Sequence, residues 1–434
     1  PVPEPDETLR RIGQNIARLV EDGSTIERGI GNIPQALTEF LKDKKDLGIR
    51  TEMFSDWIID LIECGAITCA KKSINRSKVV ASFCMGSKRL YDYINNNPLF
   101  EFYPTEYVND PYIISRREKM VGINVDLEID LTGQVCADSL GYQFYSGIGG
   151  QVDFIRGAAR SRGGKAIIAI PSTAKNGKVS RIVPHLTEGA GVVTTRGDVH
   201  YVVTEYGIAY LHGKSIRERV LDLINITHPK FRKQLIGAAK AQKYVYEDQI
   251  ELAWEQVAYP DELEHYDTLH DGTEIFFRPV KPTDEPALSG MLYSLSEESV
   301  RKRYMTRTKA FPHKDVQQLT NIDYKNDLAI VGVVPGVSGE QIVAIGQYFL
   351  DPKTQSAEVA FIVQDEWQQK GMGTFLLDYL TQIAKQRGVK RFYGKVLPNN
   401  KPMLAIFHNS GYKVNTEFDG EVYSVMYDLT KVLF

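Results

Sequence analysis

Residues 24–34 read Ser-Thr-Ile-Glu-Arg-Gly-Ile-Gly-Asn-Ile-Pro, which is a short apolar run, a glycine turn and the start of a helical pattern. Proline is favoured at the first position of a helix, so we expect that helix to begin at Pro34. Residues 47–54 predict a second strand and residues 57–63 a second helix, because their apolar residues follow strand and helix spacing. Strands that alternate with helices predict an α/β fold with a parallel sheet covered by helices.

The rest of the chain predicts a second domain. Residues 165–206 hold β-branched runs broken by Gly and Asn, which indicates several closely spaced strands. Residues 259–272 are polar, acidic and rich in turn-forming residues, and a strand-and-helix pattern restarts at Glu274. We therefore predict a first domain over 1–258, a linker over 259–272 and a second domain over 273–434.

The composition is that of a globular protein, since 43% of the 434 residues are hydrophobic and 25% are charged, with a net charge of −3. This balance gives no electrostatic footprint for nucleic acid. The longest apolar stretches fall far below the roughly 20 residues that span a bilayer. Four cysteines without a Cys-x-x-Cys pair predict buried thiols in a reducing cytoplasm and no metal site. We therefore expect a cytoplasmic protein with small-molecule partners, no nucleic acid and no membrane.

Two glycine-rich loops are candidate anion-binding sites. The first spans Gly29 to Ile33, and the second lies within residues 145–158. A glycine turn between a strand and a helix lets backbone N–H groups point into a cleft beside the positive end of the helix. Glu52 lies at a predicted strand end, where α/β folds present reactive groups. Composition alone would make it one of 55 acidic residues.

Seven short motifs give these features a common meaning. They are Arg28-Gly-Ile-Gly-Asn-Ile-Pro34, Leu47-Gly-Ile-Arg-Thr-Glu-Met-Phe-Ser-Asp56, Asn109-Asp-Pro111, Asp130-Leu-Thr-Gly-Gln-Val135, Ser146-Gly-Ile-Gly-Gly-Gln-Val-Asp-Phe154, Pro171-Ser-Thr-Ala-Lys175 and Val203-Thr-Glu-Tyr-Gly207. In this order they resemble the acetyl-CoA hydrolase/transferase family, and most closely its 4-hydroxybutyrate CoA-transferase-like branch. The resemblance implies a family I CoA-transferase-like α/β lobe and covers the second of two tandem halves. Together with the proline-rich start of the chain, it predicts an upstream half.

The resemblance implies a covalent mechanism with Glu52 as the nucleophile. The carboxylate would attack an acyl-CoA, and the released CoA thiolate would return to form a glutamyl-CoA thioester that a short-chain carboxylate resolves. It places the oxyanion and CoA loop at Gly29, Ile30, Gly31, Asn32 and Ile33, and further CoA contacts at Gly150 and Lys175. Water in place of the carboxylate would make a hydrolase, and the sequence leaves this alternative open.

Two residues near Glu52 depart from the family pattern. The family has a histidine before Thr-Glu-Met and a glycine after Ser-Asp, where this chain has Arg50 and Trp57. Trp57 either narrows the acyl pocket or packs in the core, and we favour the core. We assign Asp56 and Glu63 to caps or solvated faces.

The second domain carries its own motifs. They are Glu358-Val-Ala-Phe-Ile-Val363, Gln368-x-x-Gly371-x-Gly373 and the segment from Asn400 to Gly411-Tyr412. Together they resemble the GNAT acetyltransferase family, which implies a mixed α/β domain that binds acetyl-CoA. Glycine at a helix N-terminus allows close approach of the pyrophosphate to the backbone. The implied acetyl-CoA contacts are Val363, Gln368, Gly371, Met372, Gly373, Thr374 and Asn400.

Catalysis in the second domain depends on two positions. Glu358 is the candidate general base for an amine or a protein lysine. Phe407 stands where many relatives carry a tyrosine that protonates the CoA thiolate. The first position favours an acetyltransferase, and the second favours a non-catalytic acetyl-CoA sensor that regulates the transferase. The oligomeric state stays open, with a homo-oligomer among the options.

Overall fold

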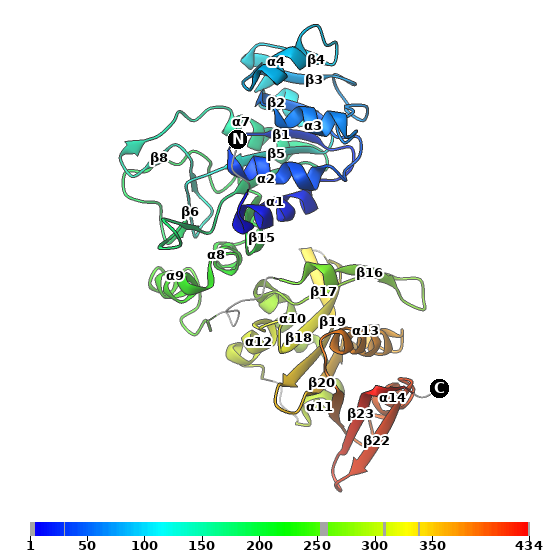
Figure 1. The fold of residues 1–434 in the computed structure, drawn as a ribbon. Coiled ribbons are helices and arrows are strands. Elements are labelled where there is room, and N and C mark those ends of the chain that lie inside the picture. The colour runs from blue at the N-terminus through cyan, green and yellow to red at the C-terminus, as the bar shows by residue number, and fades with distance from the viewer. Residues whose placement is uncertain (1–4, 30, 252–258, 307–309, 337–338, 433–434) are drawn as a thin grey trace. The chain divides into compact units, whose positions relative to one another are not determined.

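The computed structural model describes residues 5–29, 31–251, 259–306, 310–336 and 339–432. The chain forms two compact units, Pro1–Glu247 and Asp248–Phe434, which Figure 1 shows in blue to green and in green to red. The division precedes the predicted linker 259–272. Within that range, a 3-10 helix η1 (Asp261–Leu263) and strand β16 (His265–Thr268) form part of the second unit.

The first unit is built on an eight-stranded sheet in the order β15-β14-β10-β5-β1-β2-β3-β4. Its strands are parallel except for β15, which runs antiparallel to β14, so the predicted parallel sheet is confirmed. The strands are β1 (Thr25–Arg28), β2 (Gly48–Phe54), β3 (Val79–Cys84), β4 (Phe100–Phe102), β5 (Met120–Val125), β10 (Lys165–Ala169), β14 (Tyr201–Thr204) and β15 (Gly207–Tyr210).

Helices cover both faces of this sheet. The helices are α1 (Glu7–Leu19), α2 (Asn32–Leu41), α3 (Trp57–Glu63), α4 (Lys88–Ile94), α5 (Thr105–Val108), α6 (Pro111–Ser115), α7 (Gln151–Arg160), α8 (Ile216–Asn225) and α9 (Pro229–Ala241). Val121 and Ile123 of β5 share a core with α1, α2 and α3, whereas Gly122 between them faces α7. Successive side chains of a strand point to opposite faces, so α7 covers the face opposite α1. Helix α2 begins at Asn32, two residues before the predicted Pro34.

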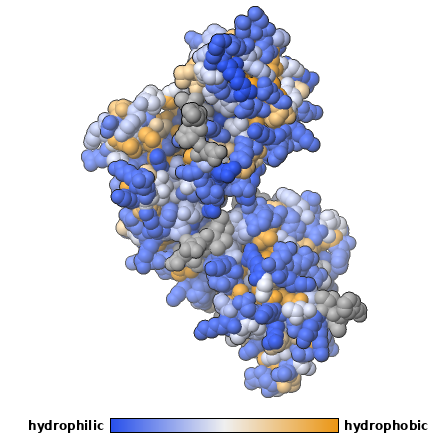
Figure 2. Space-filling view, viewed as in Figure 1, coloured by the Kyte–Doolittle hydropathy of each residue, from blue (hydrophilic) through white to orange (hydrophobic). Residues whose placement is uncertain are grey.

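Short strands form three small sheets beside the main one. They are β6 (Glu128–Asp130), β7 (Val135–Cys136) and β13 (Ile182–Val183); β8 (Ser139–Leu140) and β9 (Gln143–Phe144); and β11 (Thr173–Ala174) and β12 (Val179–Ser180). Exposed apolar side chains, including Leu140, Phe144 and Ile148, gather around β8 and β9, where Figure 2 shows orange atoms.

The second unit is an eight-stranded sheet in the order β16-β17-β18-β19-β20-β21-β23-β22. All neighbours are antiparallel except β20 and β21, which are parallel. The strands after β16 are β17 (Glu274–Pro279), β18 (Asp327–Gly336), β19 (Gly339–Asp351), β20 (Ser356–Val363), β21 (Arg391–Val396), β22 (Tyr412–Phe418) and β23 (Tyr423–Val432).

Helices pack on this second sheet and close its core. They are η2 (Pro282–Asp284), α10 (Glu285–Ser294), α11 (Glu297–Tyr304), α12 (His313–Thr320), η3 (Asp365–Trp367), α13 (Met372–Gln386) and α14 (Lys401–His408). Helix α13 contacts β19 and β20, and α11 contacts β20. In the ranges that the structure describes, no helix combines the length and apolar character needed to cross a bilayer.

Candidate active sites

Glu52 lies near the carboxyl end of β2 and is half-buried. Its Oε2 accepts a hydrogen bond of 2.9 Å from Nδ2 of Asn109, the residue that ends α5. Oδ1 of Asn109 is enclosed and has no hydrogen-bond partner among the described residues. The amide therefore holds the carboxylate on one side and keeps an acceptor for a further donor on the other.

Gly150 brings backbone against the same carboxylate. It is the N-cap of α7, and a Cβ built there would overlap Oε2 of Glu52 and Nδ2 of Asn109. Only glycine permits this approach. The next residue, Gln151, donates a hydrogen bond of 2.7 Å to buried Asp126, which fixes the start of α7. The structure thus places Gly150 beside Glu52, and the contact of Gly150 with CoA stays a prediction.

A Gly150→Ala variant is expected to lower acyl exchange at least about tenfold, because the methyl group would push the Glu52 carboxylate from its position. Stability should change little, since the φ of −85° at this residue suits alanine. Steady-state exchange kinetics and thermal melting measure the two effects. Gly237→Ala is the matched control, because this exposed glycine of α9 lies outside both glycine loops and a Cβ there meets nothing within 4 Å. Equal losses in both variants would contradict the role of Gly150.

The first glycine loop contributes helix amides. The N–H of Gly29 donates to the carbonyl of Ile123 at 3.4 Å, so that amide is used within the sheet. Gly31, with a φ of 120°, is the N-cap of α2, and within the described part no side chain caps this helix. The first amides of a helix lack partners inside it, so Asn32 and Ile33 are the better anion donors. The predicted contact at Ile30 lies outside the described residues.

The two departures from the family pattern both make packing contacts. Trp57 packs against the core, and the Arg28 guanidinium lies 4.0 Å from its ring centroid. Arg50 is buried and donates to the carbonyls of Tyr107 and Val108, the second at 3.1 Å. These carbonyls directly precede Asn109. Arg50 therefore holds the chain segment that presents the amide to Glu52.

The charge of Glu52 acts on two other acidic side chains, Glu27 and Asp153. Burial raises the pKa of Glu27 to about 8, and the charge of Glu52 adds to this rise. Oε2 of Glu27 accepts hydrogen bonds from the N–H of Ile123 and from Nδ2 of Asn124. Burial, with the charge of Glu52, also raises the pKa of Asp153. Glu27 is thus protonated at neutral pH and adds no second buried charge beside Glu52.

The remaining predicted residues of this unit have simple surroundings. Lys175 is exposed in the turn between β11 and β12, and its contact with CoA stays a prediction. Asp56 accepts hydrogen bonds from the backbone and hydroxyl of Ser87, and exposed Glu63 pairs with Arg89 at 3.0 Å.

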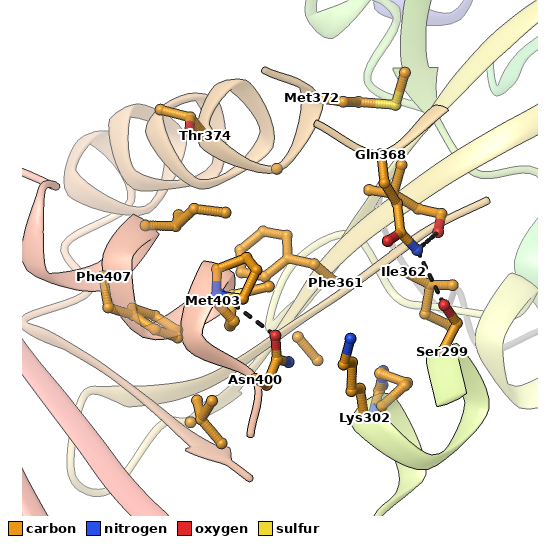
Figure 3. A pocket seen from close by; sticks show the side chains of 18 of the residues that line it. Ser299, Lys302, Phe361, Ile362, Gln368, Met372, Thr374, Asn400, Met403 and Phe407 are labelled. Atoms are coloured by element: carbon orange, nitrogen blue, oxygen red, sulfur yellow. Dashed lines mark hydrogen bonds between the residues drawn. The ribbon is translucent and has the colours of Figure 1, made fainter. Parts of the chain in front are cut away.

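In the second unit, β20 and β21 diverge and open a cleft. Their pairing ends at Glu358 opposite Tyr393, although both strands continue. A cavity of about 640 Å³ opens beside this point, and its wall includes Glu358, Lys395 and Phe361. Figure 3 shows this cavity, with Phe361, Met403 and Asn400 among the side chains that line it.

The predicted pyrophosphate loop forms the other end of this cavity. Gln368 donates from Nε2 to the carbonyl of Val363 and to the hydroxyl of Ser299, both at 3.0 Å (Figure 3). Gly371 has a φ of 91° and is the N-cap of α13, a left-handed conformation that glycine adopts without strain. Met372, Gly373 and Thr374 form the first turn of α13. These three residues and Gly371 line the cavity.

Asn400 and Phe407 complete the wall. Asn400 is the N-cap of α14, where its side chain accepts from the N–H of Met403, as Figure 3 shows. Phe407 is buried, and its ring lies 6.0 Å from that of Tyr427. All the residues predicted to bind acetyl-CoA thus surround one cavity.

The structure adds residues that the sequence did not identify. Asn109 belongs to a quoted motif, yet its contact with Glu52 joins residues 57 positions apart. His270, between β16 and β17, lines the GNAT cavity beside Gly371, and the sequence pattern there predicts only a linker. Arg303 of α11 lines the cavity near Glu358. Within the described residues, no group of three or more His, Cys, Asp or Glu side chains could hold a metal ion.

Comparisons with known proteins match a region in each of the two units. Residues 86–239 match the acetyl-CoA hydrolase/transferase C-terminal domain, and residues 293–412 match the acetyltransferase (GNAT) family. Each of the two units thus contains a region that matches one of these two families.

The curated proteins similar to this chain include CoA-transferases and an acetyl-CoA hydrolase. The chain is 54% identical over 238 residues to 4-hydroxybutyrate coenzyme A transferase of Clostridium kluyveri, covering 55% of this chain and 56% of that one. It is 50% identical over 229 residues to succinyl-CoA:cyclohexane-1-carboxylate CoA transferase of Geobacter metallireducens, covering 53% and 52%. The crystal structure of RipA from Yersinia pestis is similar with a TM-score of 0.54 and 42% identity, covering 56% and 55%. The chain spans about half the length of the relatives it matches.

Proposed function

We propose that the first unit transfers CoA between an acyl-CoA and a short-chain carboxylate through a glutamyl-CoA thioester on Glu52. The observation that carries this proposal is the Glu52 carboxylate, held by Asn109 and approached by the backbone of Gly150. A carboxylate carries its own nucleophilic oxygen and attacks without a general base. The relatives' names as CoA-transferases support this reaction.

The reaction forms two covalent intermediates on Glu52, first an anhydride and then a thioester. The carboxylate attacks the acyl carbonyl, the C–S bond breaks, and CoA thiolate leaves an acyl-glutamyl anhydride. The thiolate then attacks the glutamyl carbonyl and expels the acyl carboxylate. An acceptor carboxylate then attacks the glutamyl-CoA thioester, which gives a new anhydride and releases the CoA thiolate. The thiolate attacks the acyl carbonyl of that anhydride, which forms the new acyl-CoA and restores the Glu52 carboxylate. Each addition develops an oxyanion, and the helix amides of Asn32 and Ile33 are the donors that would stabilise it, each worth about 3–4 kcal/mol when lost.

We further propose that an upstream half completes this cleft, because the relatives are about twice as long as the matched region. Water as the acceptor would make the same site a hydrolase. Incubating full-length protein with acetyl-CoA and measuring its intact mass tests the thioester. A glutamyl-CoA thioester forms from a carboxyl group and a thiol with the loss of one water. A mass increase equal to the mass of CoA minus that of one water therefore supports the proposal. If free CoA is released in the absence of any added carboxylate, and as fast as acyl groups exchange in its presence, the result supports the hydrolase.

We propose that the second unit is an acetyl-CoA-dependent N-acetyltransferase. We also propose that the whole protein is cytoplasmic. The observation that carries the acetyltransferase is one cavity whose wall includes both the Gly371 loop and Glu358. The loop amides would hold the pyrophosphate, and Glu358 would accept the proton of the attacking amine. The buried ring of Phe407 favours a second candidate, a non-catalytic acetyl-CoA sensor, since it supplies no acid for the thiolate.

Glu358→Gln is expected to lower acetyl transfer about 10²-fold or more, because the amide keeps the size of the side chain but accepts no proton. Acetyl-CoA affinity, measured by calorimetry, should stay nearly unchanged. Exposed Glu366 offers a control, since Glu366→Gln makes the same change outside the cavity. A sensor would transfer no acetyl group to any amine in the parent protein, yet acetyl-CoA would alter the kinetics of the first unit. Equal rates for parent and Glu358→Gln protein would exclude Glu358 as the base.

A further inference from the structure

Arg303 occupies the last turn of α11, on the wall of the GNAT cavity. The orientation of α11 follows from its hydrogen bonds, since Ser299 contacts Gln368 at the pyrophosphate loop. Arg303 comes one turn later, and a helical turn rises about 5.4 Å. Arg303 therefore lies further from the loop than Ser299 does, towards Glu358.

The Arg303 guanidinium lacks a full set of partners. Its Nε is enclosed and has no hydrogen-bond partner in the part of the chain that the structure describes. Burial lowers the pKa of Arg303, although the charge of Glu358 opposes this effect. The neighbouring Lys302, which Figure 3 shows on the cavity wall, is instead paired with Glu298 at 2.5 Å. The Arg303 guanidinium also lies 5.1 Å from the centroid of the Tyr304 ring. That contact leaves the Nε–H without an acceptor, and an anion in the cavity is the partner that suits it.

The phosphates of acetyl-CoA are poorly placed to supply that anion. The pyrophosphate loop follows Val363, and Glu358 lies five residues earlier on β20. A strand rises about 3.3 Å per residue, so the two ends of the cavity are roughly 16 Å apart. Arg303 lies one helical turn beyond Ser299, which contacts the loop through Gln368, and it lines the cavity within reach of the charge of Glu358. The Glu358 end is where the acceptor amine must enter.

We propose that Arg303 binds a carboxylate of the acceptor, so that the substrate is a primary amine carrying a carboxylate group. This inference rests on the proposed acetyltransferase activity. Arg303 anchors the carboxylate while Glu358 takes the proton from the ammonium group. The amine nitrogen then attacks the acetyl carbonyl, the C–S bond breaks, and the nitrogen releases its second proton to solvent while the departing CoA thiolate takes one proton from solvent. The carboxylate belongs either to a free amino acid or to an acidic residue beside a lysine in a peptide.

Matched acceptors test the proposal. At saturating acetyl-CoA, kcat/KM is measured for glycine, glutamate and lysine and for their carboxamides. It is also measured for peptides in which the acceptor lysine is flanked by glutamate and for peptides in which it is flanked by glutamine. We expect kcat/KM to favour the carboxylates about tenfold to a hundredfold, as for a hydrogen-bonded charge pair. Arg303→Met should reduce this preference to near one, and Arg303→Lys should restore part of it. The pair of acceptors that shows the preference identifies the source of the carboxylate.

Arg301→Met is the control, because it removes an exposed cation of the same helix and should keep the carboxylate preference. Calorimetry adds a readout independent of turnover, in which N-acetylated glutamate should bind the CoA-saturated parent protein more tightly than the Arg303→Met variant. Equal rates with carboxylates and carboxamides would overturn the inference but leave the acetyltransferase. The inference would also be overturned if the Arg303→Met variant bound acetyl-CoA more weakly but kept the preference for carboxylate acceptors, because Arg303 would then contact the coenzyme. Absence of transfer to every amine, with acetyl-CoA still bound, would remove the acetyltransferase and the inference together.

Discussion

Glu52→Gln is expected to abolish the covalent CoA adduct and to lower acyl exchange by at least about 10⁴-fold, as loss of a covalent nucleophile does. The amide oxygen of glutamine can still accept the hydrogen bond from Nδ2 of Asn109, so the surrounding structure should persist. A neutral amide has no ionised oxygen to attack an acyl carbonyl. Intact-mass analysis after incubation with acetyl-CoA measures the adduct, and exchange of labelled acetate into acetyl-CoA measures turnover.

Glu63→Gln is the matched control for this experiment. Glu63 is exposed at the end of α3, pairs with Arg89, and lies outside the site around Glu52. This variant should form the adduct and exchange acyl groups at the rate of the parent protein. If Glu52→Gln protein kept a CoA adduct of the same mass, the nucleophile would be a different residue and the proposed mechanism would be wrong.

The order of elements in the first unit could be predicted because it depends on local patterns. Apolar spacing places α3 at residues 57–63, and the structure has Trp57–Glu63. The start of α2 at Asn32 was missed, because Gly31 already permits the turn and the proline preference is only statistical. The linker over 259–272 was predicted from polar composition. Its residues His265–Thr268 instead pair with β17, a contact that depends on tertiary structure.

The site around Glu52 shows where local patterns reach their limit. The motif order identified Glu52 and Gly150, but the contact of Asn109 with Glu52 depends on how α5 packs beside β2. Arg50 departs from the family pattern, and only the structure shows that it binds the carbonyls before Asn109. The same holds for Arg303, whose sequence context, Arg-Lys-Arg, is that of a solvated helix face. Its relation to the cavity follows from the packing of α11 on β20.

Gly373→Glu is expected to weaken acetyl-CoA binding about a hundredfold or more. Gly373 lies in the first turn of α13 and lines the cavity, and a Cβ there would lie 2.9 Å from Cδ1 of Ile406. A glutamate adds a larger side chain and a negative charge where we propose that the pyrophosphate binds. Like charges in a partly enclosed site repel, so both size and charge oppose the ligand. Calorimetric titration with acetyl-CoA measures the loss.

Gly290→Glu makes the same chemical change on the exposed face of α10, where a Cβ meets nothing within 4 Å. This control should bind acetyl-CoA as the parent protein does. Thermal melting separates a lost ligand site from a lost fold, and Gly373→Ala reports the effect of size without charge. We expect the alanine variant to bind with intermediate affinity, because Ile406 ends in a flexible methyl group that can move aside. Undiminished binding by a folded Gly373→Glu variant would show that the pyrophosphate does not lie against the start of α13.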